Sequence, residues 1–151
     1  HPDSLTVEYK ESIYVGYRWA EKQGIKPLFA FGHGLSYTTF EYGEAKCRKS
    51  GDGFKVSVEV TNTGKVEGKE IVQLYIADEE SYLERPVKEL KGFKKVALAP
   101  GETKKVTFDI EPDMLKFYDP EKGWVLEPGE FTAHVGAASD DIRTTVAFNV
   151  K

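Results

Sequence analysis

A strict alternation of apolar and polar residues constrains the fold of this chain more than any other feature. Between Phe54 and Thr61, four apolar residues alternate with Lys, Ser, Glu and Thr. In an extended strand all four apolar side chains lie on one face. The same period returns in later segments, which are separated by turn residues such as Pro100-Gly101 and Pro128-Gly129. No helical period of useful length occurs after residue 54, so the pattern predicts a protein built from β-strands.

The apolar runs predict about seven strands. Glu70 to Asp78 is more continuously apolar than the other runs, which indicates a central strand, and Gly92 is expected to form a bulge inside the run from Leu90 to Leu98. The other expected strands are Phe40–Cys47, Phe54–Val60, Val106–Ile110, Phe131–Val135 and Val146–Val150. Short strands at this spacing predict an all-β, immunoglobulin-like sandwich, nearer the fibronectin type III form, over residues 40–151.

The core of this sandwich must be held by apolar packing. Cys47 is the only cysteine, so no intrachain disulfide can form, and we expect Cys47 to be a half-buried strand thiol. Period-two counting places Phe108 and Phe148 on inward faces.

The charge and the distribution of apolar residues disfavour some classes of partner. The net charge of −4 is spread without long runs of one sign, which disfavours a nucleic-acid partner. No apolar stretch is long enough to cross a membrane and no signal peptide is recognised. The chain of 151 residues starts with His-Pro-Asp, which suggests a fragment of a longer protein. The sequence therefore does not indicate the cellular compartment of that protein.

Residues 1–39 do not fit the strand pattern, and we expect them to be an interdomain segment. Ser12 to Trp19 suits a short strand or a helix, and KPLFAFGHGLSYTTFEY follows from Lys26 to Tyr42. The segment holds too many large apolar groups for a free tail: Tyr9, Ile13, Tyr14, Val15, Tyr17, Trp19, Leu28, Phe29, Phe31 and Leu35.

We expect these rings to have two roles. Tyr37 and Phe40 should pack on the sandwich, because they lead into the first strand. Tyr14, Tyr17, Trp19 and Phe29 should face a second domain. Without that domain, the chain is expected to self-associate weakly.

Several long stretches resemble one family. GYRW followed by PLFAFGHGLSYTTFEY resembles the segment that leads into the C-terminal, fibronectin type III-like domain of glycoside hydrolase family 3, the β-glucosidase family. Further matching stretches are VTNTGKVEGKEIVQLYIAD, RPVKELKGFKKVALAPGETKKVTF and FYDPEKGWVLEPGEFTAHVGAASDDIR. The chain departs from the family at Ala30, where proline is usual, and at Trp19-Ala20-Glu21, where aromatic and acidic residues are common.

The resemblance implies a non-catalytic accessory domain. The parent would be a β-glucosidase- or β-xylosidase-type hydrolase whose preceding domains supply the nucleophilic aspartate and the acid/base. This domain would contribute stability, domain packing and contacts on the substrate side. The family's aspartate motif has no match here, so no catalytic residue is carried over, and no cofactor or metal is expected. The alternative is a free-standing module that binds carbohydrate or protein.

Two stretches carry candidate contact residues. His33, between Gly32 and Gly34, is either a ligand contact or, as we favour, a histidine in a tight turn; the glycines lack the context of a phosphate loop. Trp124 is flanked by carboxylates, so it could stack on a sugar, although packing over the sandwich end is the commoner role. These carboxylates are Asp119, Glu121 and Glu127.

The remaining acidic groups and histidines predict no metal site. Asp140-Asp141 and Asp78-Glu79-Glu80 are expected to be solvated turns, because the ligand spacing of a calcium loop is missing. His1, His33 and His134 have no zinc-ligand spacing.

Overall fold

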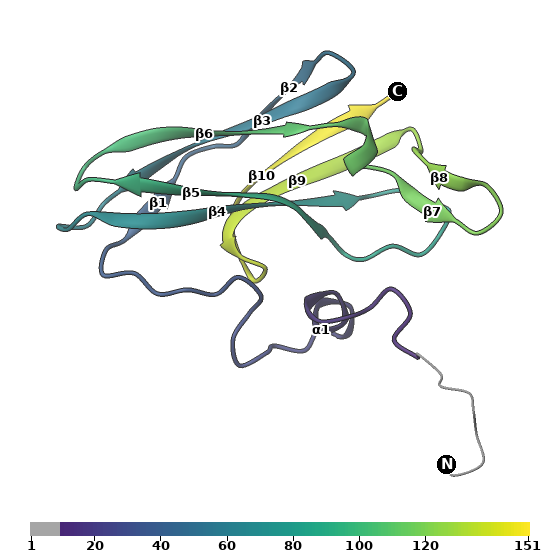
Figure 1. Ribbon diagram of the computed structural model, residues 1–151, viewed down its shortest axis with the longest axis horizontal. Helices are drawn as coiled ribbons and strands as arrows, with labels where there is room; N and C mark the ends of the chain where they lie inside the picture. The colour runs from purple at the N-terminus through teal and green to yellow at the C-terminus, as the bar shows by residue number, and fades with distance from the viewer. Residues whose placement is uncertain (1–9) are drawn as a thin grey trace, which may run out of the picture.

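The computed structural model describes residues 10–151, and the strands form two packed sheets with a small hairpin at one end (Figure 1). In the first sheet β3 pairs with β6 on one side and with β1 and β2 on the other; the second has the order β10-β9-β4-β5. The strands of the first sheet are β1 (Phe40–Tyr42), β2 (Lys46–Ser50), β3 (Gly53–Asn62) and β6 (Thr103–Ile110). Those of the second are β4 (Gly68–Asp78), β5 (Glu89–Leu98), β9 (Gly129–Ala138) and β10 (Asp141–Val150).

This arrangement confirms the predicted all-β sandwich. β1 and β2 lie along the same edge of β3, so the two sheets hold three and four strand positions, which together make the seven expected. One detail was wrong, because the strand predicted over Phe40–Cys47 is two strands. The chain leaves the ladder between Tyr42 and Lys46, where the backbone N–H of the buried Ala45 donates to Thr144 Oγ1 of the other sheet at 2.9 Å.

The core lies between the sheets and follows the sequence alternation. Val56, Val58 and Val60 of β3 are almost fully buried, and Phe108 and Phe148 are buried as predicted. The Phe148 ring contacts both Phe54 and Phe131, with centroids 4.7 and 5.8 Å away. The two sheets are therefore joined by aromatic and aliphatic packing.

Gly92 has the predicted place at a bulge and also a packing role. The pairing of β4 with β5 shifts between Leu74 and Tyr75, which stand opposite Gly92 and Leu90. A Cβ at Gly92 would lie 3.3 Å from the Phe108 ring, so glycine lets β5 approach the core closely.

The hairpin of β7 (Phe117–Asp119) and β8 (Gly123–Val125) was not expected from the sequence. It follows the 3-10 helix η1 (Pro112–Met114), whose N-terminal turn carries a capping box between Glu111 and Met114.

The helix α1 (Tyr17–Gln23) resolves the ambiguous stretch from Ser12 to Trp19. It begins after Gly16, at φ 62°, and ends at Gly24, which has left-handed φ and ψ. No helix among residues 10–151 is long and apolar enough to cross a membrane. The predictions for His1, Tyr9 and the first nine residues of the 1–39 segment lie outside the described residues.

Candidate interdomain surface

Residues 10–37, here called the covering layer, lie on the outer face of the sheet that contains β4 (Figure 1). Val72, Leu74 and Ile76 of β4 point into the sandwich core. The alternate residues Gln73, Tyr75 and Ala77 are buried as well. β4 thus has two buried faces, which explains why its sequence is apolar without a clear alternation.

Tyr17 of α1 joins the covering layer to the sheet. Its ring stacks on Phe31 at 4.9 Å between centroids and meets Tyr75 edge-on at 5.9 Å. Its hydroxyl accepts a 2.9 Å hydrogen bond from the backbone N–H of Leu90. The expectation that Tyr17 faces a second domain is therefore wrong, because its ring and its hydroxyl are both engaged by the sandwich.

Gly32 allows the chain to pass close above β4. Gln73 Nε2 donates to the Gly32 carbonyl at 3.2 Å and to the Ala137 carbonyl at 2.5 Å. Gly32 has φ 82°, and a Cβ there would overlap the Gln73 side-chain amide. Gly34 has open space around it. Only the first glycine of Gly-His-Gly is thus required by packing.

His33 lies in a turn, as favoured from the sequence. Its backbone N–H donates to the Ala30 carbonyl at 3.0 Å, and its exposed ring is 5.3 Å from that of Phe29. Both side chains are exposed.

A chain of ion pairs extends from β4 to α1. Arg85 contacts Asp78 at 2.7 Å and Glu89 at 3.1 Å, and Glu89 also contacts Arg18 of α1 at 2.7 Å. Burial raises the pKa of Asp78 in spite of Arg85. Burial acts in the same direction on Glu89, but Lys91, Arg18 and Arg85 outweigh it and lower the pKa of Glu89.

The position of Asp78 corrects one prediction. Only 3% of its side chain is exposed, so it is not a solvated turn residue, whereas Glu79 and Glu80 are exposed as expected. This network was not predicted from the sequence, because charged residues of both signs follow one another in this region and nothing in the sequence indicates which of them are buried.

Glu21 forms a second ionic link and leaves one atom without a partner. Glu21 Oε1 contacts Lys88 Nζ at 2.5 Å, and that ammonium lies 5.7 Å from the centre of the Tyr75 ring. Glu21 Oε2 is buried and has no hydrogen-bond partner among the described residues. Glu21 also borders a largely apolar groove of about 610 Å³ that includes Ile25, Phe29 and Phe31.

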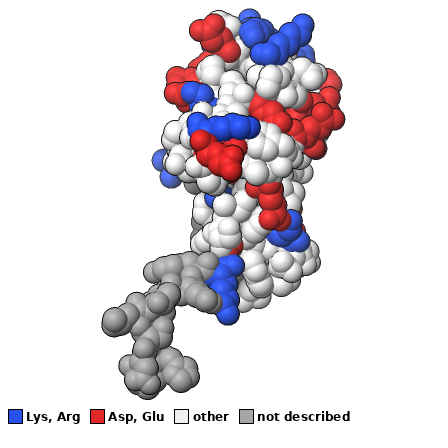
Figure 2. Space-filling view, turned by 90° about the vertical axis from the view of Figure 1, so that its right-hand side faces the viewer, with Lys and Arg blue, Asp and Glu red and all other residues white. Residues whose placement is uncertain are grey.

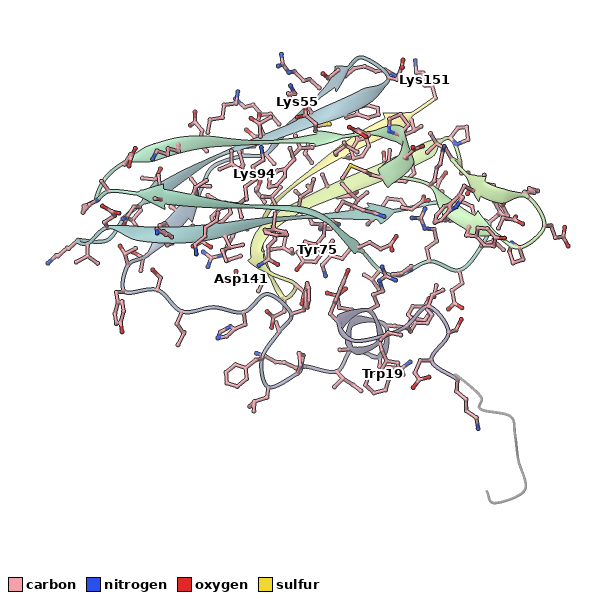
Figure 3. All side chains as sticks on the ribbon, in the orientation of Figure 1. Trp19, Lys55, Tyr75, Lys94, Asp141 and Lys151 are labelled. Atoms are coloured by element: carbon pink, nitrogen blue, oxygen red, sulfur yellow. The ribbon has the colours of Figure 1, made fainter. Side chains whose placement is uncertain are left out.

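The outer side of the covering layer exposes large apolar side chains. Tyr37 is completely exposed, so the expectation that it packs on the sandwich is wrong, whereas Phe40 does pack against the core. Figure 3 places Tyr75 on the side of the sheet that faces α1 and Trp19 on the far side of α1. The exposed apolar residues of the layer are Ile13, Val15, Trp19, Ile25, Leu28, Phe29, Phe31, Leu35 and Tyr37.

The β7–β8 hairpin holds the other candidate residues. Trp124 is 68% exposed, so it does not pack over the end of the sandwich. Asp119 is buried and accepts hydrogen bonds from Glu121 N at 2.7 Å, Lys122 N at 3.0 Å and Tyr82 Oη at 2.5 Å. The Tyr82 bond lowers the pKa of Asp119, and the same bond raises the pKa of Tyr82 to about 12. Asp119 therefore braces the turn.

Residues 10–151 contain no group of three metal-ligating side chains. Asp140 is exposed in the turn before β10, and Asp141 pairs with Arg143 on the same strand. Cys47 is half-buried, as expected, and burial raises the pKa of its thiol.

Comparison with known proteins places these features in a family. The model of the fibronectin type III-like domain matches residues 70–139. A β-glucosidase of Bacteroides ovatus is 54% identical over 97% of this chain, and a putative β-xylosidase of Formosa agariphila is 44% identical over all of it. The chain spans about a fifth of the length of these relatives, 20% of the first and 19% of the second.

Solved structures agree with the sequence comparison. The crystal structure of a Kluyveromyces marxianus β-glucosidase superimposes on 95% of this chain with a TM-score of 0.90 at 46% identity, and the chain covers 18% of it. A GH3 β-glucosidase of Bifidobacterium adolescentis gives a TM-score of 0.93 at 35% identity. The superposition covers 98% of this chain and 22% of the β-glucosidase chain. The similarity thus includes the covering layer as well as the sandwich.

Proposed function

Since this chain belongs to the fibronectin type III-like domains of glycoside hydrolase family 3, we propose that it is a non-catalytic accessory domain that packs against the rest of a longer glycosidase. Residues 40–151 form the sandwich, and residues 1–39 form the segment that lies between it and the preceding domains. The partners are the preceding domains of the same chain, and the contribution is stability and domain packing.

The two-sided covering layer is the observation that carries this proposal. Its inner side packs on the sandwich, but on its outer side Leu28 is 90% exposed and Phe29 is 68% exposed. Burial of each such side chain contributes about 1.5–3 kcal/mol. Many large exposed apolar side chains on one short segment are typical of an interaction site.

The groove beside Glu21 supports the same conclusion. It is open and mostly apolar, and the neighbouring Glu21 Oε2 lacks a donor among the described residues. A segment from a preceding domain that fills the groove would bury its apolar walls.

The proposal predicts that the 151-residue chain alone hydrolyses neither aryl β-glucosides nor aryl β-xylosides. A retaining glycosidase needs two carboxyl groups about 5–5.5 Å apart on either side of the bond that is cleaved. The measurement is a chromogenic assay of the purified chain. Turnover that survives repurification and disappears when one carboxylate is changed would contradict a non-catalytic role.

The docking role is tested in the longer protein with Phe29→Ser. We expect a lower melting temperature and faster proteolysis between the domains, because an apolar contact is lost. Phe93→Ser is the matched control, since Phe93 is 66% exposed but lies on β5, outside the covering layer. Equal effects of the two substitutions would argue against docking through this surface.

A free-standing binding module is the second candidate. It is favoured by the inner contacts of Tyr17 and Gly32, which occupy part of the covering layer without any further domain. The reading frame distinguishes the two, because an accessory domain requires several hundred preceding residues and a free module does not.

A further inference from the structure

Two exposed aromatic rings stand together on the β7–β8 hairpin, away from the apolar groove of the covering layer. Tyr118 and Trp124 are directly opposite each other in the hairpin pairing. Their ring centroids are 5.7 Å apart at 76°, and they are 60% and 68% exposed. A large part of each ring therefore meets solvent, so the pair presents aromatic surface that a ligand can contact.

The hairpin that carries these rings is well supported. Asp119 accepts hydrogen bonds from two backbone N–H groups of its turn and from the Tyr82 hydroxyl. On the inner side of the hairpin the Phe117 ring meets Tyr82 at 5.4 Å and lies 5.1 Å from the Arg85 guanidinium. The aromatic pair thus stands on a braced support, which reduces the ordering cost of binding.

A groove of about 330 Å³ runs beside the two rings, and we call it the hairpin groove. Its walls come from the hairpin and the residue before it, from the loop between β4 and β5, from the start of β5, and from the covering layer. They carry Arg18, Lys91, Lys116 and Glu84. Its volume falls at the lower end of the range for small-molecule sites.

The charges of the hairpin groove are largely balanced. Arg18 and Lys91 share Glu89, Lys116 pairs with Asp113 at 2.6 Å, and Glu84 pairs with Lys22. Figure 2 shows this end of the molecule, where acidic and basic side chains are interspersed. The groove therefore offers N–H donors and carboxylate acceptors without a strong field of one sign, which suits uncharged hydroxyl groups.

From this geometry we infer that the hairpin groove binds a neutral pyranose oligosaccharide. The C–H groups on one face of a pyranose ring stack on the electron-rich face of Trp124 or Tyr118. Its hydroxyls exchange hydrogen bonds with Arg18, Lys116 and Glu84 at the groove wall. This site does not depend on the accessory role, because all of its residues belong to this chain.

Titration with cellotetraose, a neutral β-linked glucose tetramer, tests the site. The 151-residue chain is used with Trp19→Phe, so that Trp124 is the only tryptophan left of the two. We expect a saturable change of tryptophan fluorescence and saturable heat of binding, with millimolar affinity. A chain that is folded by circular dichroism but shows no saturable signal up to roughly 20 mM sugar would overturn the inference.

Matched substitutions locate the site. In the calorimetric titration, Trp124→Ala or Tyr118→Ala should weaken binding about tenfold, which is about 1.4 kcal/mol. Phe93→Ala removes an equally exposed ring elsewhere and should leave the affinity unchanged. Equal weakening by all three, or tighter binding of a galacturonic-acid tetramer than of cellotetraose, would contradict a neutral-sugar site at this hairpin.

Discussion

The sandwich and the covering layer are held together by different interactions. The sandwich has a continuous apolar core to which both sheets contribute, with Val56, Leu74 and Val135 fully buried. In the covering layer, α1 has no buried residue at all, and the layer is held by one aromatic contact, a few hydrogen bonds and ion pairs. The difference indicates that the sandwich core supplies most of the apolar packing of this chain, while the covering layer protects the outer face of β4 and needs a partner for its own outer surface.

Removal of a core ring should give the largest effect. Phe108→Ala should lower the free energy of unfolding by about 3–5 kcal/mol, because the side chain is almost fully buried between the sheets. Phe93→Ala, on the exposed side of β5, should cost less than about 0.5 kcal/mol. Chemical denaturation measures both. A loss below about 1 kcal/mol for Phe108→Ala would contradict the tightly packed core that distinguishes the sandwich from the covering layer.

A methyl group at Gly32 should affect the covering layer next most strongly. Gly32→Ala should cost about 1–3 kcal/mol, since φ is positive and the new Cβ overlaps Gln73. The loss cannot exceed the free energy with which the covering layer docks on the sheet, because the layer can detach and so avoid the overlap. The measured loss is therefore a lower bound on this docking free energy. Gly34→Ala is the control, because nothing lies near it. If both variants unfold at the same denaturant concentration, the layer contributes nothing to global stability.

The ionic link between α1 and β5 should have a smaller effect. Arg18→Gln should cost up to about 1 kcal/mol at low salt and less at high salt, because the Arg18 side chain is about a third exposed. Arg143→Gln breaks an ion pair within β10 and should leave the covering layer unaffected. Amide exchange in α1 measures the difference, and equal exchange in the two variants would contradict the role of Arg18.

The smallest effect concerns pH. Burial, with Lys88 adding to it, lowers the pKa of His134, which pairs with Tyr75 across β9 and β4. The folded protein therefore binds this proton less tightly than the unfolded chain. The stability is complete above the unfolded pKa of about 6.5 and is lost as the pH falls toward the folded pKa. His134→Gln should remove this part of the slope as the pH falls below about 7, and an unchanged slope would contradict it.

The sequence predicted the sandwich because its signal is local. The alternation from Phe54 to Val60 and the turns at Pro100-Gly101 and Pro128-Gly129 are visible in short windows, and the resemblance extended the same conclusion. The β7–β8 hairpin was missed because three-residue strands are too short to establish a period.

The covering layer was predicted less well for a physical reason. Which side of a short irregular segment faces the sheet depends on long-range contacts, such as those of Tyr17 with Tyr75 and of Gly32 with Gln73. Tyr17 and Tyr37 were consequently assigned to the wrong sides. One signal could have helped, because the two-sided apolar run from Glu70 to Asp78 already required something to cover its outer face.

Hydrogen exchange on the chain alone and on the longer protein proposed to contain it tests the central claim most directly. In the chain alone, amides of residues 17–35 should exchange much faster than those of Val56–Val60 or Leu74–Ile76, because the covering layer is packed on one side only. In the longer protein, protection should rise in residues 17–35 and stay constant in β3 and β4. Protection of residues 17–35 that equals the core in a monomeric sample of the chain alone, and that does not change in the longer protein, would contradict the account and favour a self-contained module.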